Sequence, residues 1–470
     1  MPVKTKPQAV ERAQAWLEEH QDELLADLRA MLRIPSVQGE AEPNAPFGSE
    51  NRRALDLALR LGEKWGMRTR DVEGYAGHAE FGDGEPLVMA LGHLDVVPAG
   101  DGWKHEPFGA EIDGGYVYAR GAQDDKGPTM AIFYAARALK ETGADLPARL
   151  RVVFGCNEES GFKCVKRYFE VEEAPTLGVA PDAAWPLIHA EKGIANLTIR
   201  VPLPKGAITL TVLQGGSRPN VVPDKARAVL VIAESEMAAV REKCDDYWDR
   251  NVSFTIQDRS VEIDAIGSAA HGSTPFEGDN AIVRALRAAA ALAPAEQQEQ
   301  FSKLLAIGHT SGAGLGIHGR DDVSEDLTTN LAIAEVAGGA AVLTINVRYP
   351  VEWKGADVRE RCSEFLKEEF EGAEVEDFSD SPPLYFPLDR EPVKTILEAY
   401  REEIEEDKEP GVMGGGTYAR AVPNTVSIGT GWEGDGPAHQ HDERLKVEHL
   451  HKMARIYANI LYRLTHAAAR

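Results

Sequence analysis

The residues best suited to chemistry in this sequence lie in five short polar segments. Each segment combines carboxylates or imidazoles with a Gly-rich turn, or follows directly after an apolar run. The segments are 92–98, 121–127, 156–161, 181–183 and 438–443. In a sheet with parallel strands, ligands gather outside the carboxyl ends of the strands, so residues far apart in the sequence can converge there. We therefore expect these five segments to build one site.

The residue types in these segments are those of a site for two metal ions. Two metal ions about 3.5–4 Å apart need a bridging carboxylate together with terminal imidazole and carboxylate ligands. Imidazole nitrogen and carboxylate oxygen suit Zn²⁺, and also Mn²⁺ or Co²⁺. Asp95 follows His93 by two residues and can fix its second ring nitrogen. Of the adjacent Glu158 and Glu159, one can bind a metal while the other takes a proton from the attacking water.

Alternating helices and strands are expected to position the first four segments. A stripe of leucines and methionine predicts one helix through Leu17 and Met31 that stops before Pro35. Further helices are expected at about 50–65 and 127–140, and apolar runs predict strands at 87–91 and 150–154. Strands separated by helices imply a mixed, mostly parallel sheet covered by helices, the α/β class.

The pattern changes after about Gly193, where short strands, several of them alternating, and Ala-rich helices form an α+β segment of their own. A helix is expected at 281–292 and a strand at 340–349. Residues 377–387 are interpreted as the linker out of this segment, and the remainder returns to helix, Gly-rich turn and strand. We therefore expect a catalytic domain in two parts, 1–192 and 383–470. An inserted lid domain of two α+β halves, 193–382, separates them.

Composition restricts the partners and the compartment. The 470 residues include 51 Lys and Arg against 76 Asp and Glu, a net charge of −25. The electric field of so large a negative charge repels nucleic acid and anionic membrane surfaces, so neither is expected as a partner. No apolar run approaches the roughly 18 residues that span a bilayer, and residues 1–32 lack a signal-peptide pattern. Four scattered cysteines without a CxxC pair suit a reducing compartment, so a cytoplasmic protein is expected.

Three of the segments also resemble a known family. Residues 92–98 (GHLDVVP), 121–127 (GAQDDKG) and 157–161 (NEESG) stand in the order and spacing of the dinuclear zinc hydrolases that include acetylornithine deacetylase, succinyl-diaminopimelate desuccinylase and carboxypeptidase G. Within that family the chain is most similar to the bacterial dipeptidase V type. The resemblance extends from Ile34 to His439, nearly the whole chain.

The resemblance implies two divalent ions per chain, with Zn as the first candidate and Mn or Co as the others. The implied ligands are His93, Asp124, Glu159, Asp182 and His439. Asp124 would bridge the ions, His93 and Asp182 would bind the first, and Glu159 and His439 the second. Asp95 would orient His93. Glu158 would be the general base and acid that activates a water bridged between the ions.

The resemblance further implies that the inserted segment carries residues that hold the substrate. His271 would stabilise the oxyanion, a contribution of a few kcal/mol for one such donor. Asn220 and Arg348 would hold the substrate's terminal carboxylate, together with backbone near Gly416. The planar guanidinium of Arg matches a carboxylate bidentately. Because the insertion of about 190 residues is long enough for two dimerisation-type units, we expect a monomer that supplies its own His271.

Three functions remain to be compared. A dipeptidase acting on dipeptides and very short peptides with a free N-terminus is favoured, since Asp at position 182 goes with peptidases in the resembled family. An N-acyl-amino-acid deacylase or desuccinylase of the same family is the alternative. A catalytically inactive binding protein is a third, which the complete ligand set disfavours. His441 could replace His439 as the ligand, because it lies only two residues further on.

Overall fold

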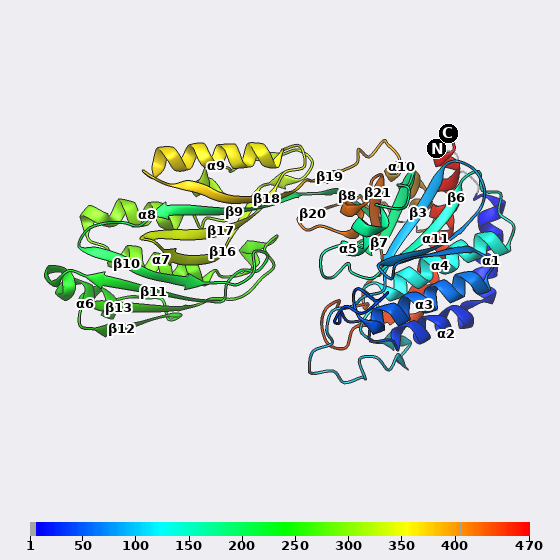
Figure 1. Cartoon of the computed structure of the whole chain (residues 1–470), viewed down its shortest axis with the longest axis horizontal. Coiled ribbons are helices and arrows are strands. Elements are labelled where there is room, and N and C mark those ends of the chain that lie inside the picture. The colour runs from blue at the N-terminus through cyan, green and yellow to red at the C-terminus, as the bar shows by residue number, and fades with distance from the viewer. Residues whose placement is uncertain (1–5, 405) are drawn as a thin grey trace. The chain divides into compact units, whose positions relative to one another are not determined.

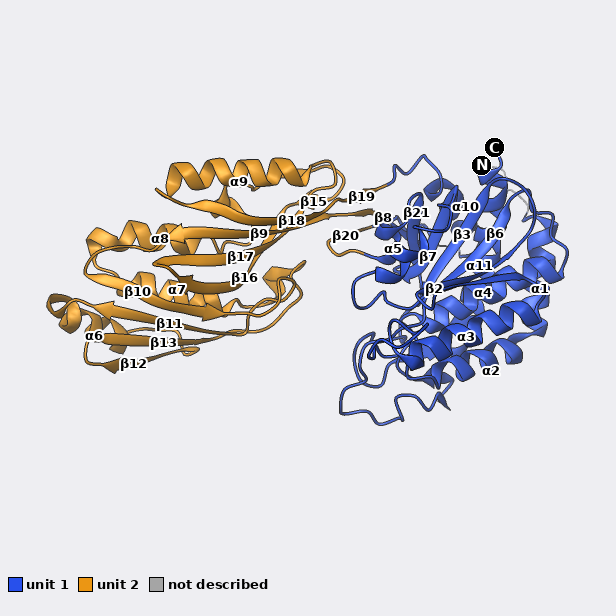
Figure 2. Cartoon of the chain, viewed as in Figure 1, with its two compact units in different colours: residues 1–189, 386–411, 417–470 blue, residues 190–385, 412–416 orange. Residues whose placement is uncertain are grey.

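The computed structural model describes residues 6–404 and 406–470, which fall into two compact units. Unit 1 comprises 1–189, 386–411 and 417–470, and unit 2 comprises 190–385 and 412–416 (Figure 2). Each unit is built around its own main sheet, and short edge strands of the larger sheet come from residues 190–191, 384–385 and 412–413 of unit 2. The domain boundaries expected at 192/193 and 382/383 stay a prediction.

The larger sheet is parallel at its centre and antiparallel at both edges (Figure 1). Its strand order is β1 (Arg68–Val72), β2 (Ala76–Phe81), β6 (Arg149–Gly155), β3 (Leu87–His93), β7 (Leu177–Ala183), β21 (Thr425–Gly429), β8 (Leu187–Glu191) and β19 (Leu384–Tyr385), and β20 (Gly411–Met413) also pairs with β8. β3 pairs in parallel with β6 and β7, and β21 in parallel with β7. Every residue of β3 is buried, which explains its uninterrupted apolar run.

Helices pack against this sheet in unit 1. They are α1 (Gln8–Glu19), α2 (Gln21–Leu32), α3 (Ser49–Lys64), α4 (Lys126–Glu141), α5 (Lys163–Tyr168), α10 (Val393–Glu403) and α11 (Val447–Ala468). α4 and α11 pack on each other and on β3, and α3 packs on β1 and β2. The burial of nearly every residue of α4 makes it the central helix. Among the described residues, no helix is both long and apolar enough to cross a membrane.

A small sheet in unit 1 ties the C-terminal part of the chain to the first half. It consists of β22 (Arg444–Lys446), β5 (Tyr116–Tyr118) and β4 (Glu111–Asp113). β22 pairs antiparallel with β5. Segment 438–443, which precedes β22, is thereby fixed next to segment 121–127, which follows β5.

Unit 2 is built on one antiparallel sheet of order β12 (Val252–Gln257), β13 (Ser260–Ile266), β11 (Lys225–Ile232), β10 (Ile208–Gly215), β16 (Thr328–Ala337), β17 (Ala340–Tyr349), β9 (Gly193–Pro202) and β18 (Glu374–Ser381). Its helices are α6 (Met237–Asp245), α7 (Ala281–Leu292), α8 (Gln298–Ala306) and α9 (Gly355–Glu369), and a hairpin of β14 (Arg320–Asp321) and β15 (Glu325–Asp326) stands apart. Short 3₁₀ segments are η1 (Glu234–Glu236), η2 (Pro275–Glu277), η3 (Ala295–Gln297), η4 (Ala313–Leu315) and, in unit 1, η5 (Tyr418–Ala421). α7 packs on β10, β11 and β13, and α9 on β9 and β18. The predicted fold class, a mixed α/β sheet with an inserted α+β unit, is confirmed.

Two local predictions are wrong. The single helix expected through Leu17 and Met31 is two helices, because the backbone leaves the helical conformation at His20 (φ −114°, ψ 19°), whose ring stacks on Trp16. The apolar stripe continues across the break, so the pattern could not reveal it. The first part of the expected linker 377–387 is instead strand β18, an exposed edge strand with too few buried side chains to produce an alternating pattern.

Candidate metal centre

The structure brings the five predicted ligands of unit 1 together in two groups that share one residue. The groups are His93, Asp124 and Asp182, and Asp124, Glu159 and His439. Within each group, one nitrogen or oxygen atom per residue lies within 4.8 Å of the others. Asp124 belongs to both groups, as a bridging carboxylate would. That these residues bind metal stays a prediction.

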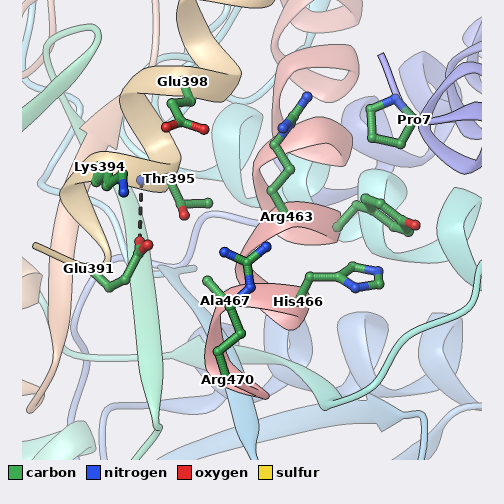
Figure 3. Close-up of a pocket in the computed structure, with 10 residues that line it drawn as sticks. Pro7, Glu391, Lys394, Thr395, Glu398, Arg463, His466, Ala467 and Arg470 are labelled. Carbon is green, nitrogen blue, oxygen red and sulfur yellow. Dashed lines mark hydrogen bonds between the residues drawn. The ribbon is translucent and has the colours of Figure 1, made fainter. Parts of the chain in front are cut away.

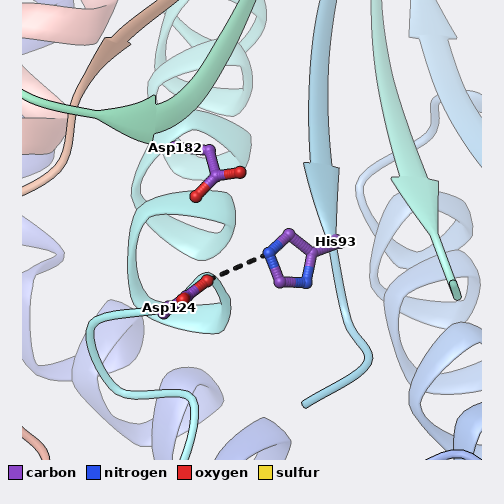
Figure 4. Close-up of side chains that lie close together, drawn as sticks. All are labelled: His93, Asp124 and Asp182. Atoms are coloured by element: carbon purple, nitrogen blue, oxygen red, sulfur yellow. Dashed lines mark hydrogen bonds and ion pairs between the residues drawn. The ribbon is translucent and has the colours of Figure 1, made fainter. Parts of the chain in front are cut away.

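His93 ends strand β3 and is completely buried. Its Nε2 lies 3.1 Å from Asp124 Oδ1, and its Nδ1 lies 3.0 Å from the backbone oxygen of Asp95. Figure 4 shows the ring directed at Asp124, with the carboxylate of Asp182 facing the same space from strand β7. With one ring nitrogen engaged by the backbone, the other is fixed in the direction of the carboxylates.

Asp95 organises the turn that carries the paired glutamates. Its Oδ1 accepts a hydrogen bond from the backbone N–H of Glu158 (3.0 Å), and its Oδ2 accepts one from the N–H of Glu159 (3.1 Å). Its Oδ1 is 3.6 Å from His93 Nδ1. The role expected for Asp95 on His93 stays a prediction, and the structure adds this second function as the anchor of the glutamate turn.

His439 approaches from the segment before β22. Its Nε2 lies 3.0 Å from Asp124 Oδ2 and 3.1 Å from Glu159 Oε1. Its backbone has a φ of 62°, a left-handed conformation that non-glycine residues adopt only where the surroundings hold them there. His441 is exposed beside Gly102, and neither group contains it.

The electrostatics of the cluster favour a bound cation. Burial, reinforced by the charge of Asp124, raises the pKa of Asp182 well above its usual range. Burial and the neighbouring carboxylates also raise the pKa of Glu158, to about 7. Burial opposes ionisation of Asp124 as well, but hydrogen bonds from His439 and His93 lower its pKa overall. Because a divalent ion would be the largest charge in such a site and would favour the ionised carboxylates, the donor set fits one.

Glu443 is a functional candidate that the sequence did not reveal. It is fully buried, and its carboxylate accepts hydrogen bonds from the backbone N–H groups of Gly121 (3.1 Å), Gln123 (2.9 Å) and Asp124 (3.1 Å). It also pairs with Arg120 at 2.7 Å. Glu443 therefore joins the loop of the shared carboxylate to the segment of His439. Glu443 lies four residues after His439, in a segment that the sequence already indicated as part of the site. Only the structure shows that its side chain is buried.

We expect Glu443→Gln to weaken metal binding about 10- to 100-fold, which is the usual effect of losing a residue that orients a metal ligand. A Gln side chain would place an amide group against backbone donors that now meet a carboxylate. Titration of the apoprotein with Zn²⁺ measures the affinity. Glu448→Gln, an exposed residue five positions on, is the matched control. Equal affinities in the two variants would show that Glu443 has no part in the metal centre.

The other predicted residues lie in unit 2 and form a cluster there. His271 Nδ1 is 2.6 Å from Ser273 Oγ, and residue 271 forms a β-bridge with Val221, next to Asn220. Arg348 donates from Nε to Asn346 Oδ1 and from Nη1 to the backbone oxygen of Gly414, both at 2.8 Å. Burial and the positive charge of Arg348 lower the pKa of His271.

Gly416, the remaining predicted substrate residue, lies in the short segment 412–416 that belongs to unit 2. The roles of Asn220, His271, Arg348 and Gly416 stay predictions.

Unit 1 has a separate cavity of about 270 Å³. Among the described residues that line it, none belongs to the predicted site. Its walls come from α10 and the end of α11 and include Lys394, Arg463 and His466 (Figure 3). Arg463 is already paired with Glu402 at 2.6 Å. The cavity therefore has no evident link to the metal centre.

The two groups of imidazole and carboxylate side chains, with one carboxylate in common, have the donor types that a pair of metal ions needs. Comparison with known proteins agrees at the level of the family. The model of peptidase family M20/M25/M40 matches residues 89–463, and the chain belongs to this family. It is accordingly a hydrolase of the peptidase type.

Two relatives are similar over almost their whole length. A putative dipeptidase of Bacillus subtilis, YtjP, is 36% identical over 459 residues, which cover 94% of this chain and 97% of the relative. A putative dipeptidase of Staphylococcus epidermidis is 33% identical over 464 residues, 95% of this chain and 98% of the relative.

Two solved structures share the fold. Human carnosine dipeptidase 1 matches with a TM-score of 0.56 at 16% identity, covering 98% of this chain and all of that chain. Aminoacylhistidine dipeptidase from Vibrio alginolyticus matches with a TM-score of 0.56 at 13% identity, covering 94% and 96%.

Proposed function

We propose that this protein is a dipeptidase that depends on two metal ions and cuts the peptide bond of dipeptides and very short peptides with a free N-terminus. The observation that carries the proposal is the pair of ligand groups that share Asp124, with Glu158 beside them but in neither group. The name putative dipeptidase, borne by relatives that match along the whole chain, supports the substrate class.

His93, Asp124 and Asp182 would hold one ion, and Asp124, Glu159 and His439 the other. The mixed imidazole and carboxylate set suits Zn²⁺, with Mn²⁺ and Co²⁺ as alternatives. When bound, two such ions polarise the scissile carbonyl and lower the pKa of the attacking water.

Glu158 supplies the proton transfers. Burial and the neighbouring carboxylates raise the pKa of this side chain to about 7 when no cation is bound. A bound cation would favour its ionised form, which can take a proton from the attacking water and return it to the departing amine. Asp95 accepts a hydrogen bond from the backbone N–H of Glu158 and so holds the backbone from which this side chain extends.

The residues of unit 2 supply binding. His271 donates a hydrogen bond to the developing oxyanion. Arg348 and Asn220, with backbone at Gly416, hold the C-terminal carboxylate of the peptide. Each chain supplies its own His271, so we propose a monomer. The four cysteines, all of them free, support a reducing, cytoplasmic setting.

The test is a substrate panel for the metal-loaded protein. We expect rapid hydrolysis of alanyl-phenylalanine and little or none of N-acetyl-phenylalanine or N-succinyl amino acids. The reverse order would establish the deacylase alternative. No hydrolysis of either class by a fully metal-loaded sample would contradict the enzyme proposal itself.

The same panel tests whether Arg348 binds the C-terminal carboxylate of the substrate. Arg348→Ala should lower kcat/KM for the free dipeptide by about the 1.5–3 kcal/mol that a hydrogen bond to a charged group contributes. Amidation of the dipeptide should cost the wild type a similar amount but add little in Arg348→Ala, since both changes remove one contact. Additive losses would show that Arg348 acts elsewhere.

A further inference from the structure

Unit 2 contains a groove of about 980 Å³, far larger than the space that the proposed contacts to the peptide backbone need. A volume of this size lies at the upper end of the range for sites that enclose whole small ligands. Its walls come from the η2 region, the segment around η4, the β14–β15 hairpin and residues 412–414. All of them belong to unit 2.

The groove begins beside the two proposed substrate contacts. Ser273, which lines it, lies within hydrogen-bond distance of His271, and Gly414, which also lines it, accepts a hydrogen bond from Arg348. In a dipeptide one carbon atom lies between the scissile amide and the terminal carboxylate, and that carbon bears the side chain of the C-terminal residue. Because Ser273 and Gly414 are hydrogen-bonded to His271 and Arg348, a peptide held by these two residues would bring that side chain within reach of the groove.

We propose that this groove receives the side chain of the substrate's C-terminal residue and favours large, aromatic side chains there. The proposal rests on the proposed function, which supplies the direction of the peptide. It adds a substrate preference that neither the metal centre nor the residues proposed to bind the C-terminal carboxylate determine.

The chemistry of the walls supports an aromatic occupant. Phe276 is 66% exposed and Val412 is 41% exposed, and both line the groove. An aromatic side chain would cover these apolar surfaces, and its ring could pack against that of Phe276. The walls carry Lys192 and Arg320 but also Glu325 and Asp326, so charge alone selects no side chain.

The hairpin that forms one wall is held in place before any ligand binds. Asp321 is buried and accepts hydrogen bonds from the backbone N–H groups of Val323 and Ser324 in the hairpin. Its other carboxylate oxygen accepts one from the N–H of Glu352, in the segment that follows β17. This wall is therefore tied to the strand that carries Arg348, as a specificity pocket requires.

The experiment compares alanyl-glycine, alanyl-leucine and alanyl-phenylalanine as substrates of the wild type and of Ala313→Trp. Ala313 is exposed and lines the groove. The wild type should cut alanyl-phenylalanine at least about tenfold more efficiently than alanyl-glycine, as expected when a pocket binds several additional carbon atoms. Ala313→Trp should remove that advantage by lowering the efficiency for alanyl-phenylalanine much more than that for alanyl-glycine.

Ala238→Trp, an exposed alanine on α6 outside the groove, is the matched control and should keep the wild-type preference. Phe276→Ala provides a second test, since it should reduce the preference for phenylalanine by removing apolar surface. A series that varies only the N-terminal residue should respond equally in all four proteins.

Equal losses for alanyl-glycine and alanyl-phenylalanine in both groove variants would overturn the inference and leave the proposed function intact. A wild type that cuts no dipeptide would instead overturn the proposed function.

Discussion

Glu158→Gln should retain both metal ions and bind substrate while losing about 10²- to 10⁴-fold in turnover, the usual contribution of general acid–base catalysis. Glu158 belongs to neither ligand group, yet it neighbours the ligand candidate Glu159. A Gln of the same shape keeps the fold of the turn, because Asp95 holds this turn through backbone N–H groups. Only the ability to move a proton is removed.

Metal analysis and single-turnover rates measure the two parts of this expectation separately. Glu170→Gln, an exposed residue near the end of α5, serves as the control and should behave as wild type. Loss of a metal ion together with activity would show that the roles of Glu158 and Glu159 are exchanged.

Removal of the metal ions should abolish activity, and Zn²⁺, Mn²⁺ or Co²⁺ should restore it. The two ligand groups share Asp124, so Asp124→Ala should impair both sites at once, whereas His439→Ala should spare the group of His93. Metal content after dialysis distinguishes these outcomes without any activity assay. Asp83→Ala, in an exposed turn, is the control.

Full turnover in a sample shown to be free of metal would contradict the whole assignment. Loss of only one ion from Asp124→Ala would contradict the bridging role alone.

The sequence predicts well those elements whose side chains repeat at a clear period. The predicted helix 281–292 coincides with α7, and the predicted strand 340–349 with β17. α7 is a helix of apolar residues with an Asn280 cap that accepts hydrogen bonds from the N–H groups of Ile282 and Val283. Most side chains of both elements are buried, so packing in the core supports the pattern that the sequence shows.

The candidate site could be predicted as a set of residues but not as a geometry. Polar residues after buried strands pointed to His93 and to the Glu158–Glu159 pair, because the ends of parallel strands converge. The function of Glu443 could not be predicted, since it depends on backbone N–H groups more than 300 residues away in the sequence. The groove of unit 2 escaped prediction for the same reason, because its walls come from segments that no local pattern connects.

The two ends of the inserted segment 190–385 lie side by side, because Glu191 pairs with Leu384 and Ala190 with Tyr385 in neighbouring strands. Paired residues of antiparallel strands are only about 4.5–5.5 Å apart. In the unfolded chain, pairing β21 with β7 would close a loop that contains the whole segment 190–385. The entropic cost of closing a loop grows with the length of the loop. Once unit 2 has folded, its ends behave as a short turn, the loop that remains is several-fold shorter, and the cost falls by roughly 1.5 kcal/mol. Early folding of unit 2 would therefore speed the completion of the central sheet of unit 1.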